Sequence, residues 1–125
     1  MAKILVIDDD RPTCTVLGLV LTGAGHEVAL FESGRLAMQS VDGGSNFDLV
    51  VTDILMPEMD GIEVIKRLRA HGTPPLILAV SGATVSAGVD VLKAALNLGA
   101  EGALRKPFTN EAFLATVAEI LSRRG

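Results

Sequence analysis

The sequence is short of several residue types, and each shortage excludes a class of protein. Its single cysteine, Cys14, excludes an intrachain disulfide framework and a zinc site built from several cysteines. Aromatic residues make up 3% of the chain and the net charge is −4, so the stacking rings and basic face typical of nucleic-acid binding are missing. No apolar run approaches the about 20 residues of a membrane span, and the start of the chain lacks a signal-peptide pattern. We therefore expect a cytoplasmic protein with no nucleic-acid or membrane partner.

The chain has 125 residues, of which 49% are hydrophobic, and we expect one domain over residues 1–125. A chain of this size buries roughly two-thirds of its unfolded surface, so folding requires no disulfide or metal. Four short apolar runs are nearly continuous rather than alternating, as in parallel strands that are buried on both faces, and a fifth strand is expected from Gly102 to Arg105. These predicted strands cover residues 4–7, 28–31, 49–52, 76–80 and 102–105.

Between these runs, apolar residues recur with a period near 3.6, which predicts helices. Cys14, Leu17 and Leu21 form one such stripe, and similar stripes lie within residues 62–68, 91–96 and 112–121. A shorter helix is expected over residues 33–41. Asp10, Ser33 and Thr109 have the side chains that cap helix N-termini. Strand and helix alternate five times, which requires parallel pairing and right-handed crossovers. The sequence therefore predicts an α/β fold, a doubly wound (βα)5 sandwich around a five-stranded parallel sheet.

Chemically active side chains follow four of the five predicted strands. Asp8 and Asp9 come after the first, Asp53 after the third, Ser81 after the fourth and Lys106 after the fifth. Ligands of open parallel sheets bind at the carboxyl ends of the strands, so we expect these side chains to share one site. Taken singly, each is more often a cap, a turn residue or a surface charge. Their joint placement favours a functional site.

Neighbouring carboxylates limit what this site can do. Two unit charges about 4 Å apart repel by about 4 kcal/mol at an effective dielectric constant of ~20, so a proton or a cation must lie among them. Oxygen ligands with room for water suit Mg²⁺ better than a softer metal. With the cation bound, Asp53 could stay ionised and accept a phosphoryl group as an aspartyl phosphate. Lys106 and Ser81 would then contact the phosphoryl oxygens.

The motifs of the chain resemble those of a known family, the receiver domain of two-component response regulators. The resemblance covers essentially the whole chain and implies a flavodoxin-like sheet of order 2-1-3-4-5. It depends on Ile4-Leu5-Val6-Ile7-Asp8-Asp9, on Asp53-Ile54-Leu55-Met56-Pro57-Glu58-Met59-Asp60-Gly61, on Val80-Ser81-Gly82, and on Gly99-Ala100-Glu101-Gly102 followed by Lys106-Pro107-Phe108.

The resemblance implies a role for each matching position. Asp53 is the expected phospho-acceptor, and Asp8, Asp9, Asp53 and the backbone carbonyl of Leu55 are the expected Mg²⁺ ligands. Lys106 matches the lysine that pairs with the phosphoryl group, and the Lys106-Pro107 bond is expected to be cis. Ser81 matches the switch hydroxyl. Gly82 matches the small residue that leaves room for the phosphoryl group. The chain would not act as an enzyme beyond its own phosphorylation and dephosphorylation.

The resemblance also implies partners. The phosphoryl donor would be a histidine kinase or a histidine phosphotransfer protein. It would dock through the first helix at Thr13, Val16 and Leu17, and through the turn after the fifth strand. Because no effector domain follows in the sequence, we expect output by contact with a downstream protein target. We expect the chain to be a monomer or a weak dimer.

One position departs from the family pattern, and two others bear on the lifetime of the phosphorylated form. Ala103 stands three residues before Lys106, where the family usually has Tyr or Phe. Our hypothesis is that output depends instead on movement of the loop over residues 82–88. In the family, the positions of Leu55 and Ala83 flank the route of the attacking water. Both residues are apolar here and cannot orient that water, so we expect slow self-dephosphorylation.

Three other functions remain open at this point. An aspartate-nucleophile phosphatase of the haloacid dehalogenase type would use Asp8, although Pro12 does not fit the motif of that class and the chain is short for it. A docking domain that is never phosphorylated would keep the fold alone, and Ala103 gives this reading some weight. A flavodoxin-like cofactor binder fits worst, because three aspartates after the first strand would repel an anionic phosphate.

Overall fold

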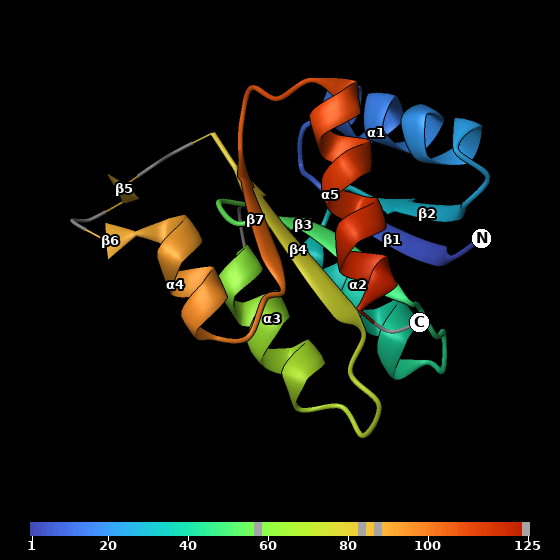
Figure 1. The fold of residues 1–125 in the computed structure, drawn as a ribbon. Helices are drawn as coiled ribbons and strands as arrows, with labels where there is room; N and C mark the ends of the chain where they lie inside the picture. The colour runs from blue at the N-terminus through green and yellow to red at the C-terminus, as the bar shows by residue number, and fades with distance from the viewer. Residues whose placement is uncertain (57–58, 83–84, 87–88, 124–125) are drawn as a thin grey trace.

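The fold is a parallel sheet covered by helices on both faces, seen in a computed structural model that describes residues 1–56, 59–82, 85–86 and 89–123 (Figure 1). The central sheet has five strands in the order β2-β1-β3-β4-β7. Because β7 is its fifth strand along the chain, this is the predicted order 2-1-3-4-5, and the predicted fold class is confirmed. The strands are β1 (Lys3–Ile7), β2 (Glu27–Phe31), β3 (Leu49–Asp53), β4 (Leu76–Ser81) and β7 (Gly102–Arg105).

The helices form one layer on each face of the sheet (Figure 1). On one face lie α1 (Arg11–Gly23) and α5 (Asn110–Ser122), and on the other lie α2 (Gly34–Asp42), α3 (Gly61–Arg69) and α4 (Val91–Asn97). Among the described residues, no helix has both the length and the apolar character needed to cross a membrane.

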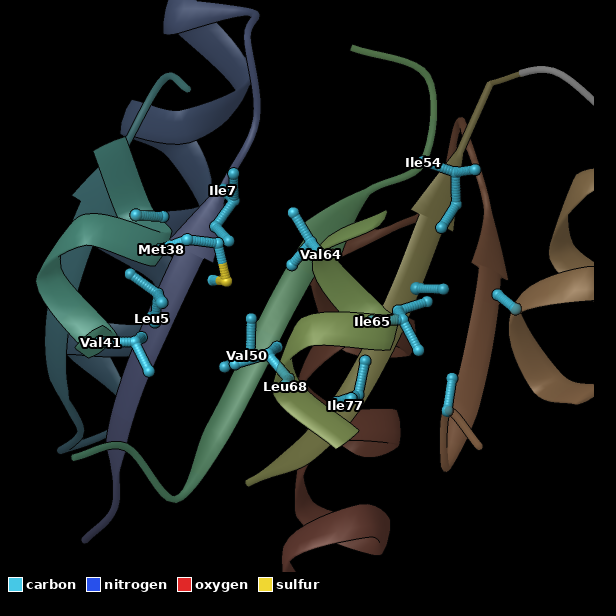
Figure 2. Packing of buried hydrophobic residues seen from close by; sticks show 14 of the residues in the cluster. Leu5, Ile7, Met38, Val41, Val50, Ile54, Val64, Ile65, Leu68 and Ile77 are labelled. Carbon is cyan, nitrogen blue, oxygen red and sulfur yellow. The ribbon is translucent and has the colours of Figure 1, made fainter. Parts of the chain in front are cut away.

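The three central strands, β1, β3 and β4, bury both faces, as their continuous hydrophobic runs predict. For the edge strand β2 the prediction of full burial is wrong, because β2 has a neighbouring strand on one side only and its residues are partly exposed, as are those of the other edge strand, β7. In β1, Leu5 and Ile7 pack toward α2 and α3, whereas Ile4 and Val6 pack toward α1 and α5. All four side chains are fully buried. Figure 2 shows the first of these two cores, where Met38 of α2 and side chains of α3 pack on the central strands. The two cores hold the sheet rigidly, so the carboxyl ends of its strands are fixed relative to one another.

The predicted helix caps are confirmed. The side chain of Asp10 accepts a hydrogen bond from the backbone N–H of Thr13, at 3.2 Å. Ser33 and Thr109 cap α2 and α5 in the same way. Each cap satisfies a backbone donor that the first turn of a helix leaves without a partner, which fixes where the helix begins.

The structure differs from the sequence prediction in the bounds of four strands and in one pair of short strands. Strands β1 and β2 each begin one residue earlier than predicted. Strands β3 and β4 each end one residue later, so Asp53 and Ser81 are the last residues of their strands. Two very short strands, β5 (Val85–Ser86) and β6 (Val89–Asp90), pair in antiparallel fashion between β4 and α4. Strands of two residues are too short to show a hydrophobic period. The loop over residues 82–88, whose movement we expect to carry the output, includes residues 83–84 and 87–88, which lie outside the described part of the chain. Ala83, which we expect to slow self-dephosphorylation, is one of these residues.

Candidate functional site

The register of the sheet brings the predicted residues to one edge. Ile7 lies opposite Thr52 in the β1–β3 pair, so Asp8, directly after β1, and Asp53, the last residue of β3, lie side by side at the ends of neighbouring strands. On the other side of β3, Asp53 lies opposite Val80, one residue before Ser81. The backbone N–H of Lys106 donates to the carbonyl of Ser81 at 2.9 Å, which places Lys106 at the same level.

Three carboxylates form the centre of this edge. One oxygen each from Asp8, Asp9 and Asp53 lies within 4.8 Å of the other two. Asp8 is fully buried and Asp53 is 7% exposed, whereas Asp9 is exposed. The Oδ1 atom of Asp8 accepts the backbone N–H of Asp10 at 2.9 Å, which holds that carboxylate in place. The predicted acidic cluster is therefore present, with one member open to solvent.

Lys106 reaches into the cluster from the β7–α5 connection. Its Nζ atom lies 2.8 Å from Oδ2 of Asp8 and 3.1 Å from Oδ2 of Asp53. The next peptide bond, Lys106-Pro107, is cis, as the family resemblance implies. Because the two carboxylates belong to different strands, the ammonium group bridges β1 and β3. It offsets part of the negative charge that they bring together.

The ionisation of these groups follows from burial and from their mutual distances. Burial and the neighbouring Asp8 carboxylate raise the pKa of Asp53, while the Lys106 ammonium and a backbone hydrogen bond from Leu55 oppose that rise. Burial alone would lower the pKa of Lys106, but its hydrogen bonds and charge interactions with Asp8 and Asp53 raise it above the ordinary value. Lys106 is therefore a firmly charged ammonium, and Asp53 is a carboxylate that gains from additional positive charge.

The donor set fits a hard divalent cation. Three carboxylate oxygens within 4.8 Å of one another match the oxygen ligands that Mg²⁺ takes, and the exposed Asp9 leaves room for the waters that this ion retains. Sulfur and imidazole ligands, which would indicate a softer metal, are absent from the cluster. The contribution of the Leu55 carbonyl stays a prediction.

The remaining predicted residues lie around this centre. Ser81 is 1% exposed at the end of β4. A Cβ atom added at Gly82 would meet Lys106 Cβ at 3.9 Å, with nothing nearer in the described part of the chain, so there is space beside the lysine. Ala103 packs against the core under α2, α3 and α4. Ser81 and Gly82 thus border the site, whereas Ala103 contributes to the packing of one sheet face.

Gly61 has a role that the sequence does not reveal beyond its place in the family motif. A Cβ atom at Gly61 would lie 2.3 Å from the carbonyl oxygen of Asp53 and 2.6 Å from Cα of Ile54. The backbone N–H of Gly61 also donates to the carbonyl of Ile54 at 2.7 Å. The start of α3 therefore lies directly against the backbone that carries Asp53. A contact between residues eight apart leaves no periodic signal in the sequence.

A groove of about 350 Å³ opens beside the site, between α1 and the β7–α5 connection. Thr13, Val16 and Leu17 line it on the α1 side, and Lys106 and Phe108 line it on the other. Val16 is 48% exposed. These are the positions at which the family resemblance places the docking of a phosphoryl donor, and the groove reaches the lysine of the site.

Comparison with known proteins agrees with this geometry. The family model described as the response regulator receiver domain matches residues 4–118. The chain belongs to this family.

Named relatives and solved structures of the family resemble the chain closely. The transcriptional regulatory protein TcrA of Mycobacterium tuberculosis is 39% identical, over 98% of this chain and 47% of its own length. The transcriptional regulatory protein ZraR of Escherichia coli is 38% identical, over 95% of this chain and 26% of its own length. The chain thus spans about half or less of the curated relatives that it matches. The structure of the chemotaxis response regulator CheY4 of Vibrio cholerae is 32% identical with a TM-score of 0.83, and covers 96% of this chain and 98% of that one.

Proposed function

We propose that this receiver domain accepts a phosphoryl group on Asp53 from a phosphohistidine donor and signals through contact with a downstream protein. The observation that carries the proposal is the bridge of Lys106 to both Asp8 and Asp53, at 2.8 and 3.1 Å. It joins an acceptor carboxylate, a second carboxylate and a cation at one end of the sheet. Family membership supports a histidine kinase or histidine phosphotransfer protein as the donor, acting in the cytoplasm.

In the proposed reaction, a carboxylate oxygen of Asp53 forms a bond to phosphorus while the phosphorus–nitrogen bond of the donor breaks. The imidazole of the donor leaves with the electron pair of that bond and takes up a proton. Lys106 stabilises negative charge on the phosphoryl oxygens, and the Ser81 hydroxyl donates to one of them. Asp8, Asp9 and Asp53 would hold Mg²⁺, which supplies positive charge for the incoming phosphoryl group when bound.

The groove beside the site supports a protein donor. A kinase or phosphotransfer domain must bring a histidine to Asp53, and a partly apolar surface with Val16 and Phe108 next to Lys106 is suited to such a contact. The ring of Phe108 stacks on the buried Phe113 with 5.5 Å between ring centroids, which fixes one wall of the groove.

The alternative nucleophile, Asp8 of a phosphatase-type mechanism, is not favoured. Asp8 is fully buried, and its two oxygens are occupied by the Asp10 N–H and the Lys106 ammonium. Asp53 is less buried, lies at the end of the central strand of the sheet and is the position that matches the family's acceptor.

The proposal is tested by identifying the phosphorylated residue. The protein is incubated with Mg²⁺ and phosphoramidate, a small donor with a phosphorus–nitrogen bond, and the product is mapped by peptide mass spectrometry. We expect one added phosphoryl group on Asp53 and none in Asp53→Asn. Modification of Asp8 would instead identify the phosphatase-type mechanism, and no modification of either residue would indicate a docking domain.

A further inference from the structure

Thr52 places a buried hydroxyl directly before the proposed acceptor. It is the last residue of β3 that pairs with β1, where it lies opposite Ile7, and it is fully buried. Its Oγ1 atom donates a hydrogen bond of 2.9 Å to the backbone carbonyl of Asp53. A hydroxyl is costly to bury unless it finds a partner, and here the partner belongs to the residue proposed to carry the phosphoryl group.

The peptide group between Asp53 and Ile54 is held on three sides. Thr52 donates to its carbonyl oxygen, and its N–H, which belongs to Ile54, donates to the Val80 carbonyl of β4 at 3.0 Å. The backbone of Gly61 closes the third side, because a Cβ atom there would lie 2.3 Å from the Asp53 carbonyl oxygen. Pairing with β1 ends at Thr52. The Thr52 hydroxyl therefore extends the fixed part of β3 past the last pair of that ladder, up to the acceptor.

The orientation of this peptide group matters because it links Asp53 to Leu55. The backbone N–H of Leu55 donates to the Asp53 carboxylate. The carbonyl of Leu55 is an expected ligand of the divalent cation. A rotation of the Asp53–Ile54 peptide would move both backbone groups of Leu55 relative to the carboxylate. Because Mg²⁺ demands nearly ideal ligand geometry, even a small rotation would weaken its binding.

We propose that Thr52 is a positioning residue for the phosphorylation site. Its hydroxyl fixes the peptide group that follows Asp53 and thereby holds the acceptor carboxylate and Leu55 in the arrangement that binds Mg²⁺. This inference deepens the proposed function and rests on it. Since Thr52 is fully buried, it acts through the backbone and not by contact with the phosphoryl group.

The test compares two substitutions at position 52 by calorimetric Mg²⁺ titration and by thermal unfolding in chelator. Thr52→Val keeps the shape of the side chain and removes the donor, so we expect Mg²⁺ to bind on the order of tenfold more weakly than to wild type. Its melting temperature should change little, because added apolar burial offsets part of the lost hydrogen bond. Thr52→Ser keeps the donor but removes a buried methyl group, so it should melt at a lower temperature yet bind Mg²⁺ within about threefold of wild type.

The two variants separate positioning from stability. A merely structural role would make the Mg²⁺ affinity follow the melting temperature, so that Thr52→Ser would bind more weakly than Thr52→Val. That order, or Mg²⁺ binding by a folded Thr52→Val equal to that of wild type, would overturn the proposal. If Thr52→Val fails to fold, Thr52→Ala and Thr52→Ser give the same comparison, since they differ only by the hydroxyl oxygen. Equal Mg²⁺ binding by these two would likewise overturn it.

Thr116 offers a matched control in a different element. Its hydroxyl also donates to a backbone carbonyl, that of Ala112 in α5, at 2.9 Å. Thr116→Val makes the same chemical change and should bind Mg²⁺ within about twofold of wild type. Equal weakening by Thr116→Val and Thr52→Val would contradict a specific role for Thr52.

Failure of the proposed function has a different signature. Wild type itself would then bind no Mg²⁺, or phosphoramidate would modify a residue other than Asp53, and this inference would fall with it. Where wild type is phosphorylated on Asp53, Thr52→Val should react more slowly than wild type at low Mg²⁺ and recover as Mg²⁺ approaches saturation. A rate equal to that of wild type at low Mg²⁺ would overturn the role of Thr52 while leaving the proposed function intact.

Discussion

At the scale of single residues, Asp53 is the proposed phosphoryl acceptor, and its surroundings disfavour its negative charge. It is nearly buried, and Asp8 lies beside it, so burial and like charge both raise its pKa. Lys106 offsets this effect only in part. A residue that accepts a phosphoryl group must be ionised, and here burial and the Asp8 carboxylate make ionisation less favourable than it is for a free carboxyl group. The acceptor therefore decreases the stability of the resting protein at neutral pH.

Asp53→Asn should make the metal-free protein more stable at neutral pH, by on the order of 1 kcal/mol. The sign follows from the raised folded pKa, since the stability linked to Asp53 is complete below its unfolded value of 3.8 and is lost as pH rises through the higher folded value. The gain should therefore shrink toward zero in acid. Urea unfolding with chelator across this pH range checks it, and a variant less stable than wild type at neutral pH would contradict it.

The aspartates, the serine and the lysine could be predicted from the sequence because each follows a strand that its hydrophobic run identifies. The bridge of Lys106 to both Asp8 and Asp53 could not be predicted. It depends on the reach of one side chain across two strands, which no local pattern records. The lower exposure of Asp8 relative to Asp9 likewise depends on the direction in which each side chain leaves the strand end.

At the scale of elements, the start of α3 and the end of β3 form one packed unit. The backbone of Gly61 lies against the carbonyl of Asp53 and Cα of Ile54, where any larger residue would overlap. The position of the acceptor carboxylate therefore depends on a glycine in a different element. Asp60 caps the same helix through the N–H of Glu63, at 2.9 Å, which fixes where α3 begins.

Gly61→Ala should destabilise the protein by about 2–3 kcal/mol, because backbone atoms must move to admit the methyl group. It should also slow phosphorylation of Asp53, since the strand end shifts with that backbone. Gly23→Ala in α1 is the matched control, because its added Cβ meets nothing within 4 Å, and it should be neutral or slightly stabilising. Denaturant unfolding compares the two, and equal effects would contradict the role given to Gly61.

In the described part of the chain, the sequence identified the five strands of the central sheet, most of which carry a continuous apolar run, and the five helices, most of which carry a hydrophobic period and begin at a recognisable cap. It did not indicate the pairing of β5 with β6. Strand ends were predicted one residue short at Asp53 and Ser81, because polar side chains end a hydrophobic run even where the ladder of hydrogen bonds continues.

At the scale of the whole molecule, the two layers of helices leave the carboxyl edge of the sheet open and place a groove beside it. The groove combines α1 with the segment before α5, elements at opposite ends of the chain. Through the family resemblance, the sequence alone predicted the α1 residues that line this groove. The volume of the groove and its continuity with Lys106 could be found only from the assembled fold.

Val16→Asp should slow phosphotransfer from a protein donor by about tenfold or more, because it puts a charge on the exposed α1 wall of the groove. Phosphorylation by phosphoramidate should be unchanged, since that donor needs no docking surface. Leu36→Asp on α2, at a similarly exposed position on the opposite face of the sheet, is the control and should leave both rates unchanged. Equal loss with both donors would show damage to the site rather than to docking.

The most direct test of the central claim is transfer of a radiolabelled phosphoryl group from a phosphorylated histidine kinase, measured with and without Mg²⁺. The account predicts rapid labelling of the wild-type protein only with Mg²⁺, and no labelling of Asp53→Asn under any condition. Label on Asp53→Asn equal to that on wild type, or full labelling of wild type in chelator, would contradict it.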